Sequence, residues 1–209
     1  MKSHFLLNAK SMLCKMLVLL SGILIYNVGN AQQVTPSVKA GIGFSDWNLS
    51  KGSDVVTGIL PSFHLGVFAS MDVHPSIGIV SGLEFSNGGA ELKFTDSYSP
   101  KYSLSYISLP VYGKLQLAEG LSMYAGPKAG LLLSANEKED GGDKHDVKGA
   151  FKNADFSIEC GLQYKLPAGI EVGAYFTQSL TNIYNAGETQ VRNYGFGLNA
   201  AYIIPMPKA

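Results

Sequence analysis

Apolar and polar residues alternate with a period of two along most of the chain, and the clearest example is the last segment. Between Tyr194 and Ile204 the even positions are aromatic or aliphatic, whereas the odd positions up to 201 are glycine, asparagine or alanine. The segment from Ala154 to Leu166 places seven apolar residues on one face and Asp155 with other polar or small residues on the opposite face. Successive side chains of a β-strand point to opposite faces, so this period predicts strands with one apolar face. Eight such segments are present, at residues 38–45, 63–72, 77–86, 106–115, 121–133, 154–166, 170–177 and 194–204.

The connections between these segments alternate in length. The sequence predicts short turns at 72–76, 118–120 and 167–169, and longer polar loops at 46–58, 87–101, 136–152 and 181–190. Outer-membrane barrels have an even number of strands, short periplasmic turns and longer external loops. We therefore expect an all-β fold, an eight-stranded antiparallel transmembrane β-barrel in the bacterial outer membrane, with both mature termini in the periplasm.

Two prolines interrupt this pattern. Pro110 and Pro127 lie inside expected strands. Proline cannot donate a ladder hydrogen bond and is usually confined to edges or bulges, and a closed barrel has no edge. We therefore expect local bulges near both positions.

The N-terminus has the pattern of a cleavable signal peptide. Lys2, Lys10 and Lys15 precede the apolar run Met16–Tyr26, which is too short to span a bilayer comfortably as a helix. Small residues precede a cleavage point after Ala31. We predict a signal peptide at residues 1–31 and a barrel domain at residues 32–209; the alternative is an uncleaved membrane anchor.

The composition argues against several classes of partner and chemistry. Removal of residues 1–31 leaves 13 basic and 16 acidic residues, and no Lys/Arg cluster points to a nucleic acid. Cys160 is the one cysteine that remains, so no internal disulfide is expected. No metal-binding or nucleophile motif is found. We therefore assign no catalytic, cofactor-binding or metal-binding residue, expect no cofactor, and expect membrane lipid as the main partner.

Charged residues nevertheless occupy the polar faces that a barrel turns inward. Buried charges need partners, so we expect opposite signs to pair across neighbouring strands and to fill the narrow lumen. His64 is the one member that titrates near neutral pH, and we interpret it as a hydrogen-bonded interior residue rather than a catalytic one. The expected inward set is Lys39, His64, Asp72, Glu84, Lys114, Lys128, Asp155, Glu159, Lys165, Glu171 and Arg192.

One external loop is rich in carboxylates. Residues 137–146 contain five acidic residues but lack the ligand order of an EF-hand calcium loop. We favour a solvated, mobile loop over a cation site. The loops 46–58, 87–101, 136–152 and 181–190 are the candidate contacts for a protein partner.

Several segments resemble the PorT-like outer-membrane β-barrel family of Bacteroidota. The most specific are Tyr106–Lys114, with Pro110, and Tyr124–Gly130, with its Gly-Pro pair. Gly82–Phe85, Asp155–Gly161 and Leu180–Ile183 resemble further strands of that family, although Ser157 stands where a glycine is expected. The resemblance implies an eight-stranded barrel without enzymatic activity, in a family that includes members linked to secretion and gliding.

Three functions are compatible with these patterns. The first is a non-enzymatic structural or interaction barrel, serving as an accessory of secretion or envelope assembly. The alternatives are an outer-membrane lipid hydrolase or acyltransferase, for which His64, His74 and His145 are the available mature histidines, and a small pore. A soluble lipocalin-like ligand barrel is a fourth reading, and it would turn the apolar faces inward.

Overall fold

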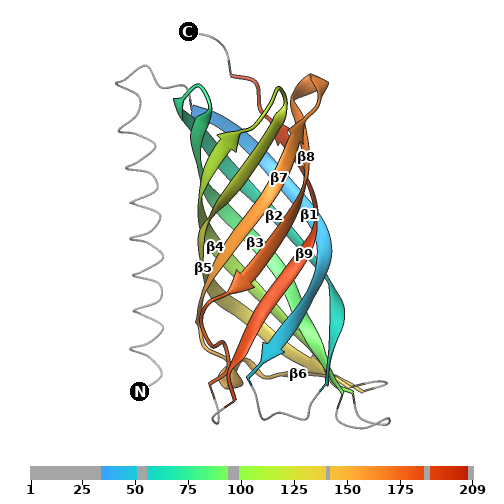
Figure 1. The fold of residues 1–209 in the computed structure, drawn as a ribbon. Coiled ribbons are helices and arrows are strands. Elements are labelled where there is room, and N and C mark those ends of the chain that lie inside the picture. Colours follow the sequence, from blue (N-terminus) through green and yellow to red (C-terminus); the bar gives the residue numbers. More distant parts are fainter. Residues whose placement is uncertain (1–33, 51–55, 94–98, 140–141, 186–188, 207–209) are drawn as a thin grey trace. The chain divides into compact units, whose positions relative to one another are not determined.

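Eight long antiparallel strands close into a ring (Figure 1). The computed structural model describes residues 34–50, 56–93, 99–139, 142–185 and 189–206. The strands of the wall are β1 (Val34–Leu49), β2 (Val56–His74), β3 (Ile77–Lys93), β4 (Lys101–Gln116), β5 (Leu121–Lys138), β7 (Ala154–Lys165), β8 (Ile170–Ser179) and β9 (Val191–Ile203). Each pairs with its neighbour in the chain, and the ring closes where β1 pairs with β9, from Ser37 opposite Ile203 to Leu49 opposite Val191. The predicted eight-stranded antiparallel barrel is confirmed. The predicted signal peptide lies outside the described residues.

The two faces of the wall follow the sequence period. Ile42 and Leu198 are 72% and 65% exposed on the outer face, whereas Lys39 and Asn199 are each 5% exposed on the inner face. Phe44, Phe196 and Phe176 lie opposite one another on β1, β9 and β8 and form part of an apolar outer belt. The barrel thus presents its apolar faces outward, as a lipid environment requires and opposite to a soluble ligand barrel.

The two ends of the barrel differ. Three short turns join strands at one end, which we call the turn end, and Gly120 and Gly169 there adopt φ angles of 75° and 77° that favour glycine. The strands run further than expected at the other end, the loop end. Residues 46–49, 56–58, 87–93 and 136–138, predicted as loops, belong to strands.

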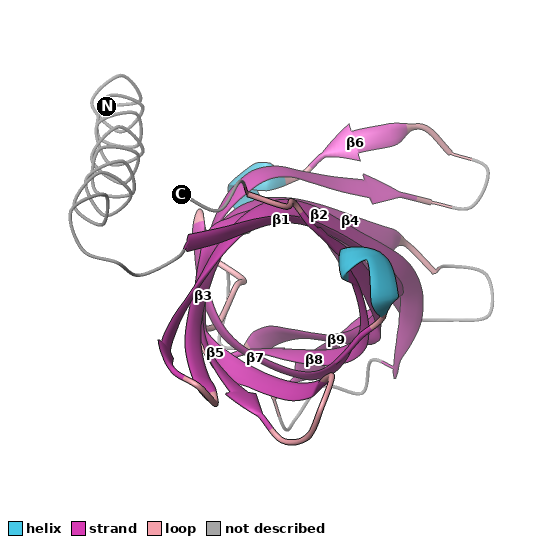
Figure 2. Ribbon diagram, turned by 90° about the horizontal axis from the view of Figure 1, so that it is seen from above, coloured by secondary structure: helices cyan, strands magenta, loops and turns pink. Residues whose placement is uncertain are grey.

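A short additional hairpin extends from the loop end. Strand β6 (Lys144–Asp146) pairs with the last residues of β5, beyond the point where β7 pairs. Figure 2, a view from above the barrel, shows β6 outside the ring of the other strands. The 3-10 turns η2 (Lys148–Ala150) and η3 (Pro167–Gly169) complete the described elements.

The bulges expected at the prolines are absent. The register between β4 and both of its neighbours is the same on either side of Pro110, and the register of β5 is likewise unchanged across Pro127. The hydroxyl of Ser81 donates to the carbonyl of Pro110 at 2.8 Å, on the side where the ladder skips a pair. Near each proline some backbone pairs of the ladder are therefore missing, but no extra residue is inserted as in a β-bulge. The β4–β5 register shifts instead between Ser105 and Tyr106.

Candidate functional site

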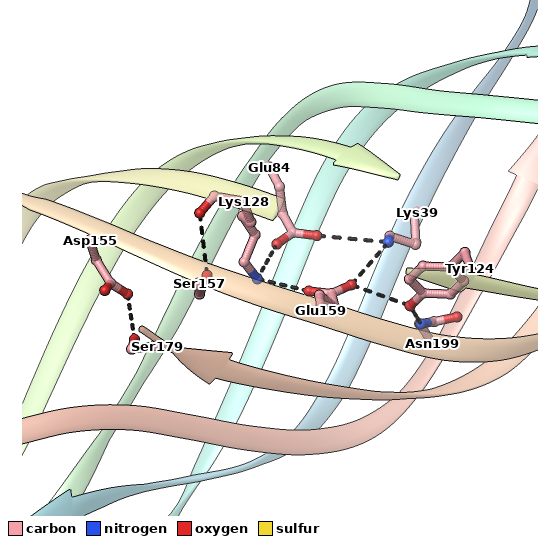
Figure 3. Close-up of polar contacts among 9 residues, drawn as sticks. All are labelled: Lys39, Glu84, Tyr124, Lys128, Asp155, Ser157, Glu159, Ser179 and Asn199. Atoms are coloured by element: carbon pink, nitrogen blue, oxygen red, sulfur yellow. Dashed lines mark hydrogen bonds and ion pairs between the residues drawn. The ribbon is translucent and has the colours of Figure 1, made fainter. Parts of the chain in front are cut away.

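Four charged side chains meet in the middle of the lumen. Lys39, Glu84, Lys128 and Glu159 come from four strands of the wall, β1, β3, β5 and β7, of which β5 and β7 are neighbours (Figure 3). The Lys128 ammonium lies 2.8 Å from Glu159 Oε2 and 3.3 Å from Glu84 Oε1. The Lys39 ammonium lies 3.9 Å from Glu84 and 3.8 Å from Glu159. This group, which we call the lumen quartet, is electrically neutral and almost completely buried.

Aromatic rings surround the quartet on one side. The Lys39 ammonium sits 4.3 Å from the ring centre of Phe68 and 5.3 Å from those of Tyr112 and Tyr124. Aromatic faces stabilise desolvated cations, so the rings add to the stabilisation that the Lys39 ammonium receives from its longer ion pairs. The Tyr124 hydroxyl donates to Glu159 Oε1 at 3.2 Å, and the Asn199 amide donates to that hydroxyl at 3.4 Å.

Inward glycines make room for these large side chains. A Cβ atom at Gly82 would come within 2.8 Å of the Phe68 ring, and one at Gly66 would come equally close. A Cβ atom at Gly161 would lie 2.6 Å from the Tyr124 ring. Large and glycine positions therefore alternate on the inner face, and together they fill the lumen of a barrel this narrow.

The quartet and its aromatic rings separate two cavities. On the turn side lies an open cavity of about 390 Å³, crossed by an ion pair between Lys114 and Glu171 at 2.7 Å. On the loop side lies a smaller cavity of about 90 Å³, whose lining includes Glu84, Lys128 and a series of serines. The quartet thus lies across the path between the two ends.

Asp155 borders the smaller cavity, and no ammonium or guanidinium group of the described residues forms an ion pair with it. It is 8% exposed, and the hydroxyls of Ser179 and Thr181 donate to its carboxylate at 2.6 and 2.8 Å. The Thr181 oxygen in turn accepts from the backbone N–H of Phe156 at 3.0 Å. This carboxylate therefore links the start of β7 to the segment that follows β8.

A hydrophobic cluster closes the loop end, and we call it the cap. Trp47, Phe151 and Ile183 are 4%, 3% and 0% exposed, and Trp47 packs on Phe151 with ring centres 5.6 Å apart. The loop between β5 and β7 contacts the loop between β8 and β9 in the cap. Phe151 forms a β-bridge with Tyr184, and the Lys152 N–H donates to the Ile183 carbonyl at 2.8 Å. The other buried members are Ala90, Leu104, Tyr106, Leu132, Ala135 and Val191.

Comparison with known proteins identifies the family. The sequence profile described as "Outer membrane protein beta-barrel domain" matches residues 25–185, more than half of the chain. The chain belongs to this family. Among curated proteins, none matches the sequence. Of the described residues, no helix is long and apolar enough to cross a bilayer.

Solved structures of small outer-membrane barrels are similar to this family member. Neisserial surface protein A is 12% identical, with a TM-score of 0.56, and the match covers 82% of this chain and 99% of that chain. The attachment invasion locus protein Ail of Yersinia pestis is 15% identical, with a TM-score of 0.45, over 80% and 99% of the two chains. OprG from Pseudomonas aeruginosa is 12% identical, with a TM-score of 0.42, over 82% and 97%. The likeness to Neisserial surface protein A shows the fold alone.

The family places this protein in the outer membrane, in contact with lipid, and confirms that part of the sequence resemblance. The narrower PorT-like assignment stays a prediction.

Most inward charges of this outer-membrane barrel form ion pairs, as expected, but most of these pairs join strands that are not neighbours in the wall. Of the quartet's ion pairs, Lys128–Glu159 alone joins adjacent strands, and Lys114–Glu171 also reaches across the lumen. Lysine and glutamate side chains are long enough to bridge so narrow a barrel. Asp72 and Lys165 are exposed at the mouth of the turn-side cavity.

Arg192 was placed on the wrong face. It is exposed and donates to the side chain of Gln190 at 3.3 Å, whereas its neighbour Val191 is buried in the cap. The alternation of β9 holds through its first residues, so the even-numbered Arg192 shares the outer face with Phe196.

The three mature histidines do not come together. His64 is buried, and its ring packs edge-on against Tyr175 at 4.8 Å, with no hydrogen-bond partner for Nε2 in the described structure. The hydrogen bond predicted for the His64 side chain is therefore absent at Nε2 among the described residues. His74 lies at the turn end and accepts a hydrogen bond from the N–H of Ser76, whereas His145 lies on β6 at the loop end. Within the described ranges, no group of three or more His, Cys, Asp or Glu side chains is arranged to hold a metal ion.

The cap is not among the features that the sequence pattern predicts. Residues 147–151 and 183 lie in segments predicted as polar loops, 136–152 and 181–190, yet Phe151 and Ile183 are buried. Of the described acidic residues in the same loop, Glu139, Asp143 and Asp146 are exposed, whereas Glu137 is half-buried and accepts a hydrogen bond from Tyr102. The signal available in the sequence was the presence of Trp47, Phe151 and Ile183 inside otherwise polar loops, because these residue types are on average largely buried in folded proteins.

Proposed function

We propose that this protein is a non-enzymatic structural or interaction barrel of the outer membrane, and that it serves as an accessory of secretion or envelope assembly. The observation that carries the proposal is the closed lumen. The neutral quartet lies across its middle, and the cap covers its loop end. A barrel filled in this way offers its rigid outer wall and its ends, rather than a passage, for function.

The chemistry of the interior supports the non-enzymatic reading. Nucleophilic catalysis needs a nucleophile and a base within hydrogen-bond reach. The hydroxyls of Ser179 and Thr181 donate to Asp155 rather than to an imidazole. We expect the refolded protein to leave phospholipids and lipid A unchanged in mass after prolonged incubation, as measured by mass spectrometry. Release or transfer of an acyl chain would overturn the proposal and favour the hydrolase or acyltransferase alternative.

Conductance tests the closed lumen directly. We expect the wild-type barrel to show no stable single-channel conductance in planar bilayers, because the side chains of the quartet leave no continuous water-filled path through the lumen. The variant Lys39→Ser with Glu159→Ser keeps the lumen neutral but removes two long side chains, and we expect it to leak. Stable conductance of the wild-type protein would favour a pore. Migration of the unboiled samples on a gel shows that both proteins are folded.

We further propose that the loop end faces the outside of the cell and that both mature termini lie in the periplasm. Short turns at one end and long loops at the other support this orientation. A protease site inserted at the exposed Gly142 should be cut in intact cells, whereas one inserted at Glu119 in a turn should be protected. The opposite result would reverse the orientation. The exposed parts of loops 46–58, 87–101, 136–152 and 181–190 are then the candidate contacts for a protein partner.

A further inference from the structure

Three lysines lie side by side across the outer face of the loop end. Lys101 on β4 is directly opposite Lys138 on β5, and Lys138 is directly opposite Lys144 on β6. Glu91 on β3 is directly opposite Lys101. Directly opposite residues of an antiparallel sheet share a face, with Cα atoms about 5 Å apart. The three lysines therefore form one row, which we call the lysine row.

The charge of the lysine row is only partly balanced. Glu91 lies 3.7 Å from Lys101 and 4.0 Å from Lys93. No carboxylate of the described residues lies within 4.0 Å of the ammonium of Lys138 or Lys144, and Asp146 is the described acid nearest to them on the same face of β6. Like charges placed directly opposite one another destabilise a sheet. Such an arrangement indicates an anionic partner.

The row belongs to the lipid-facing side of the wall. Tyr102 and Glu137, the neighbours of Lys101 and Lys138 in the chain, point to the other face, where the Tyr102 hydroxyl donates to Glu137 at 2.8 Å and the Tyr102 ring packs on Trp47. Lys138 follows Leu133, which is 47% exposed on the outer belt, by roughly 16 Å along the strand. The outer face therefore changes from apolar to cationic where the membrane surface is expected.

The position of β6 turns this face toward the membrane. Strand β6 lies outside the ring of the wall (Figure 2), so the end of β5 that pairs with it leans away from the barrel axis. The outer face of a hairpin that leans outward is turned toward the bilayer. Lys148, which follows β6, donates to the Leu133 carbonyl at 2.8 Å and so brings a fourth ammonium to the end of the apolar belt.

We propose that the lysine row binds the phosphate groups of lipid headgroups in the outer leaflet. Lysine side chains extend along apolar surface while their ammonium groups stay at the interface, and each contributes attraction to an anionic membrane surface. The continuity of the row with the apolar belt favours a lipid over a soluble anion. The proposal rests on the proposed outward orientation of the loop end, but not on a closed lumen or on the absence of enzymatic activity.

Retention of lipid A by the folded, immobilised full barrel in neutral detergent tests the proposal. The wild-type protein should bind bisphosphorylated lipid A more tightly than lipid A whose phosphates have been removed. The variant Lys138→Gln with Lys144→Gln should bind the phosphorylated form about tenfold to thirtyfold more weakly, because each lysine contributes roughly a factor of five. The difference should shrink as salt is added.

A matched variant removes the same charge elsewhere. Lys152→Gln with Lys165→Gln replaces two exposed lysines outside the row and should leave binding within about twofold of the wild type. Equal loss in the two variants would show a general charge effect and overturn the proposal. Equal binding of phosphorylated and dephosphorylated lipid A by the wild-type protein would also overturn it. A gel shift between unboiled and boiled samples establishes that each variant is folded.

Discussion

Buried charges in this barrel are compatible with folding because each ammonium of the lumen quartet faces two carboxylates. Glu84 and Glu159 are 1% and 2% exposed, so neither can rely on water. The cost of burying such groups is large, and it is offset only while the partners remain in place. The quartet therefore favours one arrangement of the lumen side chains rather than adding much net stability.

Replacement of one lysine tests this coupling. Lys128→Met removes the closer ammonium and leaves two buried carboxylates that share Lys39 at 3.8 and 3.9 Å. We expect the free energy of unfolding to fall by about 3 kcal/mol or more. Urea unfolding of the barrel refolded in lipid vesicles measures the change. Lys128→Met combined with Glu84→Gln removes one charge of each sign and should recover part of the loss; no recovery would show that the loss comes from packing alone.

A second residue-scale prediction concerns the seam where β1 meets β9. Gly43 and Gly197 lie opposite each other, and a Cβ atom at Gly197 would come within 2.3 Å of the Ile42 carbonyl oxygen. Gly197→Ala should therefore shift the backbone and destabilise the barrel by roughly 1 to 3 kcal/mol in the same unfolding measurement. Gly113→Ala is the matched control, because its Cβ would meet no atom closer than 3.9 Å. Equal effects of the two substitutions would contradict this account.

At the scale of elements, the cap shows how two loops can become part of the interior. The segments around Phe151 and Ile183 exchange backbone hydrogen bonds and place their apolar side chains over Trp47 and Leu104. Packing at the end of the lumen removes apolar surface from water and satisfies backbone groups that an open loop would leave to solvent. The described residues around Phe151 and Ile183 thus belong to the folded interior, although their sequence context is that of polar loops.

The fluorescence of Trp47 reports on the cap, because it is the one tryptophan of the chain. Phe151→Ala removes a ring 5.6 Å from Trp47, and water should then reach the indole and shift its emission to longer wavelength. We also expect a loss of about 3 kcal/mol in the free energy of unfolding, as for a buried phenylalanine. Phe156→Ala alters a residue that is 55% exposed on the outer face and should leave the emission unchanged. An unshifted spectrum for Phe151→Ala would show that the cap does not seal Trp47.

At the scale of the whole molecule, ring closure has an observable consequence. A barrel without free edges resists detergent at room temperature, because every wall strand is paired on both sides. We expect the protein in the outer-membrane fraction, and we expect its gel mobility to change when the sample is boiled. A soluble periplasmic protein without a mobility change would contradict membrane insertion.

The faces of the strands and the number of segments could be predicted from the sequence alone. A period of two records directly which side chains share a face, so segments such as 154–166 and 194–204 could be placed before any contact was known. The same period identified Lys39, Glu84, Lys128 and Glu159 as interior residues. Arg192 was misassigned because the predicted strand began at Tyr194, whereas β9 begins at Val191 and its alternation places Arg192 on the outer face.

Which interior residues contact one another depends on how the strands assemble. The four members of the lumen quartet are up to 120 positions apart in the chain, and their contacts depend on the diameter and register of the closed ring. The cap likewise depends on two loops that come together only after closure. The position of β6 outside the ring, and with it the lysine row, follows from a pairing that no local pattern records. Periodicity is a property of one strand, whereas these features are properties of how strands are assembled.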